Sequence, residues 1–222
     1  MVAPDAERSA VGHAITTLTP LRVHEFYRGR RLLGYAVNGM PADCVKIGVG
    51  SICKEPPDIV VSGINLGPNT ATNVIYSGTV SAATEARILG LPSIAISLGT
   101  YVDPDFRYAA ALAPRLVRMV LQHGLPDKVL LNVNIPNLPR AKVKGVRVTR
   151  QGSSAYVEDF AVRVDPRRQP YYWLAGTYRM TDLEEDTDAW ALENGFVSVT
   201  PVTFDLTARD AMPEVARWRW SV

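Results

Sequence analysis

The chain has 222 residues, of which 47% are hydrophobic and 21% are charged, a balance that excludes a disordered chain. Its 24 lysines and arginines nearly balance its 22 aspartates and glutamates, so it has no basic excess for binding nucleic acid. No apolar run is as long as a membrane span, and the two cysteines lack a metal-binding spacing. We therefore expect a cytoplasmic globular protein with no nucleic-acid partner and no membrane partner.

The first part of the chain predicts two extended segments and a helix, followed by a buried strand and a second helix. Residues 14–24 and 32–37 are apolar and extended, and the turn-forming segment 27–30 between them suits a hairpin. Pro41 suits the first turn of a helix that ends before Pro56. The β-branched segment 58–65 predicts a strand buried on both faces, and residues 80–89 predict a helix that ends at Gly90.

The alternation continues along the chain and then changes. Residues 92–97 and 129–133 predict buried strands, with an amphipathic helix over 106–123 between them. This order predicts an α/β fold, with a Rossmann-like three-layer core around a mostly parallel sheet. After Pro139, β segments at 143–149, 156–164, 171–174 and 196–206 surround a short helix at 186–193. We interpret residues 140–222 as a C-terminal antiparallel β extension of a single domain over residues 1–222.

The segment between residues 62 and 79 carries the strongest indication of a binding site. Ligands of open α/β sheets bind beyond the carboxyl ends of the strands, where this segment is expected to lie. Ser77, Gly78 and Thr79 occupy a predicted helix start, where unpaired backbone N–H groups and the helix dipole favour phosphate. A simple N-cap role explains Ser77 equally well, and no P-loop motif decides between the two interpretations.

Asparagines and acidic residues add candidate ligands. Asn65 directly follows the predicted strand, and its amide oxygen is a suitable ligand for a hard divalent cation. For Asn65 and Asn69 a ligand role and a turn role are equally compatible with the sequence, whereas Asn73 favours a turn. The loop near the N-terminus offers groups for metal binding or proton transfer, namely Asp5, Glu7, Ser9 and His13.

Six ordered motifs resemble one protein family over nearly the whole chain. They are APDAERS followed by VGH at 3–13, GMPADCV at 39–45, SGIN at 62–65, YSGTV at 76–80, TDAWA at 187–191 and GFVSVTP at 195–201. This pattern resembles the SurE family of metal-dependent 5'-nucleotidases. The resemblance implies hydrolysis of a nucleoside monophosphate substrate, with a divalent metal (Mn or Mg) as cofactor. It also implies a homodimer or tetramer in which a β-rich extension is exchanged between subunits.

The resemblance assigns roles to particular residues and exposes one departure. It implies that Ser9 and Asn65 bind the metal and that the phosphate is contacted by Asn69, Ser77, Gly78 and Thr79. Family members begin with a strand and an Asn-Asp-Asp-Gly motif whose aspartates also hold the metal, yet this sequence contains no Asp-Asp pair. We therefore expect an N-terminally truncated chain. The alternative is a catalytically impaired protein that binds nucleotides or phosphate, whereas an oxidoreductase would need a dinucleotide glycine fingerprint that the sequence lacks.

Overall fold

The computed structural model describes residues 1–220, with all side chains except those at 155, 156, 158 and 178. The strands are β1 (Val2–Pro4), β2 (Val23–Arg28), β3 (Arg31–Val37), β4 (Val60–Leu66), β5 (Ser93–Gly99), β6 (Val129–Pro136), β7 (Val146–Val148), β8 (Ala155–Val164), β9 (Pro170–Arg179) and β10 (Val197–Thr203). The α-helices are α1 (Pro41–Ile47), α2 (Asn73–Tyr76), α3 (Gly78–Ile88), α4 (Arg107–His123), α5 (Asp188–Glu193) and α6 (Met212–Val215). None of the helices in the described part of the chain is both long and apolar enough to cross a membrane.

The main sheet has five strands in the order β4-β5-β6-β10-β7. β4, β5 and β6 run parallel, and β10 runs antiparallel to β6 and parallel to β7. A smaller sheet has the order β1-β3-β2, and β8 pairs with β9 in a separate antiparallel hairpin. The predicted α/β fold with a mostly parallel sheet and an antiparallel β extension is therefore confirmed.

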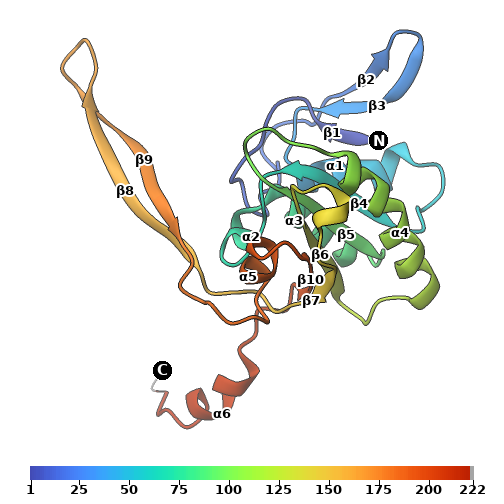
Figure 1. Ribbon diagram of the computed structural model, residues 1–222. Helices are drawn as coiled ribbons and strands as arrows, with labels where there is room; N and C mark the ends of the chain where they lie inside the picture. The colour runs from blue at the N-terminus through green and yellow to red at the C-terminus, as the bar shows by residue number, and fades with distance from the viewer. Residues whose placement is uncertain (221–222) are drawn as a thin grey trace.

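Helices cover both faces of the main sheet, which gives the expected three layers (Figure 1). On one face, Ile94, Ile96 and Leu98 of β5 form a core cluster with Leu116 and Val120 of α4. On the other face, a second cluster joins the sheet to α3, through Val74, Val80, Ala83, Ala95 and Leu130. Because side chains alternate along a strand, β5 and β6 present different residues to the two helical layers.

The predicted burial of residues 58–65 on both faces is wrong for β4. This strand is an edge of the main sheet, and the exposed fractions of Val61 and Leu66 are 41% and 46%. A β-branched run shows that a strand can be buried, but it does not show which neighbours are present to bury it. The hairpin expected around residues 27–30 is formed by β2 and β3, but the strand begins at Val23, so most of the segment 14–24 is irregular.

In the second half of the chain, some strands belong to the main sheet and others form a hairpin that projects from it. β7 and β10 belong to the main sheet, because β10 pairs with β6 along Ser198–Thr203. The hairpin of β8 and β9 extends away from the body of the protein, and α6 lies near the C-terminus on a separate protrusion (Figure 1). The last two residues of the expected extension lie outside the described residues. That residues 1–222 form a single domain remains a prediction.

Candidate functional site

A cavity of about 1130 Å³ lies between β1 and the edge strand β4, beside the start of α3. The residues that line it include Val2 and Pro4 of β1 and Val60 and Ser62 of β4. All six residues predicted for the metal and phosphate line this cavity, namely Ser9, Asn65, Asn69, Ser77, Gly78 and Thr79. Three segments that are distant in the sequence therefore meet at the carboxyl ends of parallel strands, where α/β proteins bind ligands.

Ser77 is the N-cap of α3. Its Oγ accepts a hydrogen bond from the N–H of Val80 at 3.1 Å, and its carbonyl accepts from the N–H of Ser81 at 3.0 Å. The N-cap interpretation is thus confirmed, and it is compatible with a second role. The first backbone N–H groups of a helix have no acceptor within the helix, so Gly78 and Thr79 present donors beside the cavity.

Gly78 allows other segments to pack closely against the start of α3. A Cβ atom on Gly78 would lie 2.8 Å from Cγ of Pro41 in α1 and 3.4 Å from the carbonyl oxygen of Arg8. The loop that contains Arg8 makes a second contact here, in which the N–H of Gly12 donates to the carbonyl of Tyr76 at 2.9 Å. These contacts fix the loop that carries Ser9 next to the end of α3 that is predicted to bind phosphate.

Asn69 is held in place by a buried polar network. Its N–H donates to Oδ1 of Asn134 at 2.8 Å, and its Nδ2 donates to Oγ of Ser97 at 2.7 Å. Its carbonyl accepts from Nδ2 of Asn132 at 2.8 Å and from Nδ2 of Asn134 at 3.0 Å. An amide nitrogen carries two hydrogens, so Nδ2 of Asn69 retains one hydrogen for a ligand. The network anchors the loop after β4 to the neighbouring strands β5 and β6.

Ser9 and Asn65 are of the chemical type that a hard cation prefers, but they do not complete a site for it. Nδ2 of Asn65 donates to the carbonyls of Leu66 and Gly67 at 3.1 and 2.9 Å, and Oγ of Ser9 donates to Glu7 at 2.7 Å. Both candidate ligands are neutral oxygens. Among the described residues, no group of three or more His, Cys, Asp or Glu side chains is placed to hold a metal ion. The described side chains therefore do not fit a divalent ion as a full set of ligands.

His13 forms an ion-pair cluster away from the cavity lining. Its Nε2 lies 2.8 Å from Oε2 of Glu85, and Nζ of Lys46 lies 2.7 Å from Oε1 of the same carboxylate. Burial of Glu85 opposes its ionisation, but the hydrogen bonds and charges of Lys46 and His13 together lower its pKa. His13 thus anchors the loop near the N-terminus to α3. The sequence offered no signal for this pairing, because its members are far apart along the chain.

The fold and the cavity define a three-layer α/β protein whose candidate site lies at the carboxyl edge of a parallel sheet. The model of the family Survival protein SurE matches residues 1–158. A protein from Syntrophobacter fumaroxidans described as 5'-nucleotidase SurE is 49% identical over 218 residues, which cover 98% of this chain and 87% of that protein. The chain belongs to the SurE family.

Further relatives agree with this assignment. A 5'-nucleotidase SurE from Syntrophus aciditrophicus is 52% identical over 213 residues, which cover 96% of this chain and 80% of that protein. The crystal structure of the SurE protein from Aquifex aeolicus matches with a TM-score of 0.83 and 44% identity, covering 96% of this chain and 86% of that one. The family resemblance drawn from the motifs is confirmed. The expected truncation stays a prediction, as do the roles assigned to the six residues.

Proposed function

We propose that this chain is a 5'-nucleotidase that hydrolyses nucleoside 5'-monophosphates to nucleoside and phosphate. Two relatives about half identical to it over nearly its whole length are described as 5'-nucleotidase SurE. The observation that carries the proposal is that Asn69, Ser77, Gly78 and Thr79 line the same cavity, the last three of them at the start of α3. Several donors that converge at a helix N-terminus match the charge and shape of a phosphate group.

The proposed role of these residues is to bind and stabilise the phosphoryl group. The backbone N–H groups of Gly78 and Thr79, with the hydroxyls of Ser77 and Thr79, are donors for the phosphate oxygens. Nδ2 of Asn69 adds a donor from the loop between β4 and α2. In phosphoryl transfer negative charge is spread over the equatorial oxygens, so fixed donors lower the barrier by stabilising that charge. The close packing around Gly78 and the anchored Asn69 keep these donors in place before substrate arrives.

We propose that Ser9 and Asn65 are the ligands that this chain offers to Mn²⁺ or Mg²⁺. Ser9 and Asn65 would hold such an ion beside the proposed phosphate donors, where it would supply polarisation of the phosphoryl group. Because both ligands are neutral, we expect the described residues alone to bind the ion weakly. Water attack is therefore not assigned to any residue of this chain.

The proposal extends to assembly and compartment. Large apolar side chains on the β8–β9 hairpin are exposed, including Phe160, Val162, Trp173 and Leu174. Their exposure supports a homodimer or tetramer in which another copy covers them, because large exposed apolar patches mark interaction sites. The cysteines Cys44 and Cys53 are free thiols, which supports a reducing compartment such as the cytoplasm.

A second candidate function is supported by the charge of the cavity. Among the described residues that line it, Glu7 is the only acidic side chain. A cavity with phosphate donors but few carboxylates suits a protein that binds nucleotides or phosphate without hydrolysing them. Both candidate functions require binding of AMP, but only the first requires that AMP be hydrolysed.

One experiment separates the two candidates. Phosphate release from AMP is measured with Mn²⁺ and with EDTA, and AMP binding is measured by calorimetry on the same preparation. Release that EDTA abolishes supports hydrolysis, whereas binding without release supports the second candidate. Folded protein that shows neither would contradict both. Thr79→Val, which removes a proposed phosphate donor, should weaken AMP binding, while Thr84→Val should not, because the Thr84 hydroxyl donates within α3 to the carbonyl of Val80.

A further inference from the structure

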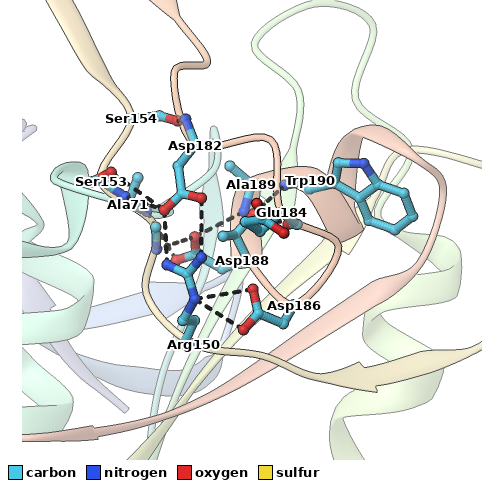
Figure 2. Close-up of polar contacts among 12 residues, drawn as sticks. Ala71, Arg150, Ser153, Ser154, Asp182, Glu184, Asp186, Asp188, Ala189 and Trp190 are labelled. Atoms are coloured by element: carbon cyan, nitrogen blue, oxygen red, sulfur yellow. Dashed lines mark hydrogen bonds and ion pairs between the residues drawn. The ribbon is translucent and has the colours of Figure 1, made fainter.

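Asp188 is a completely buried carboxylate at the start of α5, and it does not line the cavity. Its Oδ2 accepts a hydrogen bond from the N–H of Ala71 at 2.9 Å. Its Oδ1 accepts from the N–H of Gly152 at 3.0 Å. The same oxygen accepts from the N–H of Ala189 at 2.8 Å (Figure 2). One side chain thus joins three segments, and one of them is the loop that leads from Asn69 to α2.

Ala71 has a backbone conformation that needs support. Its φ is +51°, in the left-handed region that residues with a Cβ atom rarely adopt, and the residue is fully buried. Such conformations persist where the surrounding structure holds them, and they concentrate at functional sites. Besides Asp188, Gln151 supports this turn, because its Nε2 donates to the carbonyl of Ala71 at 2.8 Å. The Thr72 hydroxyl donates to the carbonyl of Ser154 at 3.0 Å.

The conformation of Ala71 affects the shape of the cavity, because Ala71 lies between two residues that line it. Asn69 lies two residues before it and is fixed to the main sheet. Asn73 lies two residues after it, lines the cavity and begins α2, which leads directly to the N-cap Ser77. The turn at Ala71 therefore decides how α2 approaches the cavity from the anchored Asn69.

One partner of Asp188, Gly152, lies in the segment that leads into the β8–β9 hairpin, and ion pairs join this segment to the one that follows the hairpin. Arg150 lies before β8, and its Nη1 lies 2.8 Å from Oδ2 of Asp182, which follows β9. Its Nε lies 3.0 Å from Oδ2 of Asp186, and the N–H of Ser153 donates to Asp182 at 3.2 Å (Figure 2). Asp188 thus joins Ala71 to a part of the chain that these contacts also connect.

We propose that Asp188 is a positioning residue for the phosphate cavity, which it serves by holding Ala71 in its left-handed conformation. The inference rests on the proposed function, since its effect on the cavity is measured as AMP turnover. It assigns Asp188 no contact with substrate. Its carboxylate is suited to the task because it offers acceptors on both oxygens, and the three groups that surround it are all backbone donors.

The test begins with Asp188→Asn. An asparagine replaces one acceptor oxygen with an NH₂ group, which then faces a backbone N–H, so one donor loses its partner. We expect kcat/KM for AMP to fall by roughly 10- to 100-fold, since a displacement of about 1 Å has an effect of that order. Asp105→Asn is the matched control, because Asp105 also accepts a backbone N–H at the start of a helix but lies outside the cavity lining. It should change kcat/KM by less than about 2-fold, as expected of a surface substitution.

A second variant separates positioning from general stability. Glycine adopts a positive φ without strain, so Ala71→Gly introduced into the Asp188→Asn chain should recover part of the lost activity. If Asp188 contributed only to overall stability, total activity would fall in proportion to the folded fraction. In that case kcat/KM per folded molecule would not change in Asp188→Asn, and Ala71→Gly would have nothing to recover. Unchanged kcat/KM in folded Asp188→Asn protein, or a loss that Ala71→Gly does not recover, would overturn the proposal.

Hydrogen exchange of residues 69–77 gives a measurement that does not depend on catalysis. We expect the amides of this segment to exchange at least about 10-fold faster in Asp188→Asn than in the unmodified chain, and to be slowed again by Ala71→Gly. Unchanged exchange would contradict the positioning role even if the chain has no nucleotidase activity. Faster exchange in a chain that releases no phosphate would support the role of Asp188 and refute the proposed function.

Discussion

Replacement of Gly78 by alanine tests whether the start of α3 is the phosphate site. The new Cβ atom would lie 2.8 Å from Cγ of Pro41, whereas carbon atoms in good contact are about 3.5–4.0 Å apart. The start of α3 and α1 must therefore separate by about 1 Å. Because Gly78 supplies one of the proposed donors, this displacement moves the site itself.

The size of the effect follows from the local geometry. Overpacking costs about 1–3 kcal/mol, and the better helix propensity of alanine offsets roughly 0.5–1 kcal/mol of it. We expect a net loss of up to about 2.5 kcal/mol, which corresponds to a fall in Tm of up to about 10 °C for a chain of this size. A displacement near 1 Å should reduce kcat/KM for AMP by on the order of 100-fold.

The assay is phosphate release from AMP at a temperature where both proteins are folded, as measured by circular dichroism. The matched control is Gly90→Ala just after α3, where φ is +86° and the new Cβ atom would meet nothing within 4 Å. Strain there costs about 1–2 kcal/mol, so the control loses similar stability but should retain its activity. If Gly78→Ala lowers Tm yet keeps kcat/KM within about 2-fold, the phosphate is not bound at this helix start.

Three further predictions concern acid stability, thiol reactivity and metal binding. Because the folded pKa of Glu85 is lowered, its contribution to stability is present above about pH 4.3, the ordinary value of glutamate, and is lost as the pH falls further. Glu85→Gln should cost about 1.5–3 kcal/mol in urea unfolding at pH 7 and less at pH 3.5; an equal loss at both would contradict the pairing. Burial, with the nearby charges of Asp43 and Asp5, raises the pKa of Cys44 to about 12. Native protein should therefore react with Ellman's reagent at the exposed Cys53 alone. Rapid reaction of two thiols would contradict this prediction. Asn65→Ala should raise the Mn²⁺ concentration for half-maximal phosphate release by about 10-fold or more, and an unchanged requirement would exclude Asn65 as a ligand.

Elements with a strong local pattern could be predicted from the sequence. The spacing of Leu112, Leu116 and Val120 indicated α4, and Gly124 indicated its end, which the structure places after His123. β5 and β6 were indicated by short apolar runs. The edge position of β4 could not be predicted, because it depends on which strands lie beside it. The insertion of β10 next to β6 also depends on a pairing between residues 64 to 74 positions apart, for which local patterns carry no information.

The candidate site could be predicted only where one segment carried the signal. Ser77 and Gly78 stand at a helix start that the sequence shows clearly, and the family motifs pointed to the same segment. The anchoring of Asn69 was missed, because it depends on Asn132 and Asn134 in a distant strand. The contact between Asp188 and Ala71 spans more than a hundred residues and also has no local signature.

The most direct measurement is inorganic phosphate released from AMP by the 222-residue chain with Mn²⁺, repeated with EDTA and with Gly78→Ala. We predict release that requires the metal and falls on the order of 100-fold in the variant, because the donors at the start of α3 are displaced. Folded protein that neither binds AMP nor releases phosphate, or a Gly78→Ala variant as active as the unmodified chain, would contradict the assignment of this cavity as a nucleotidase site.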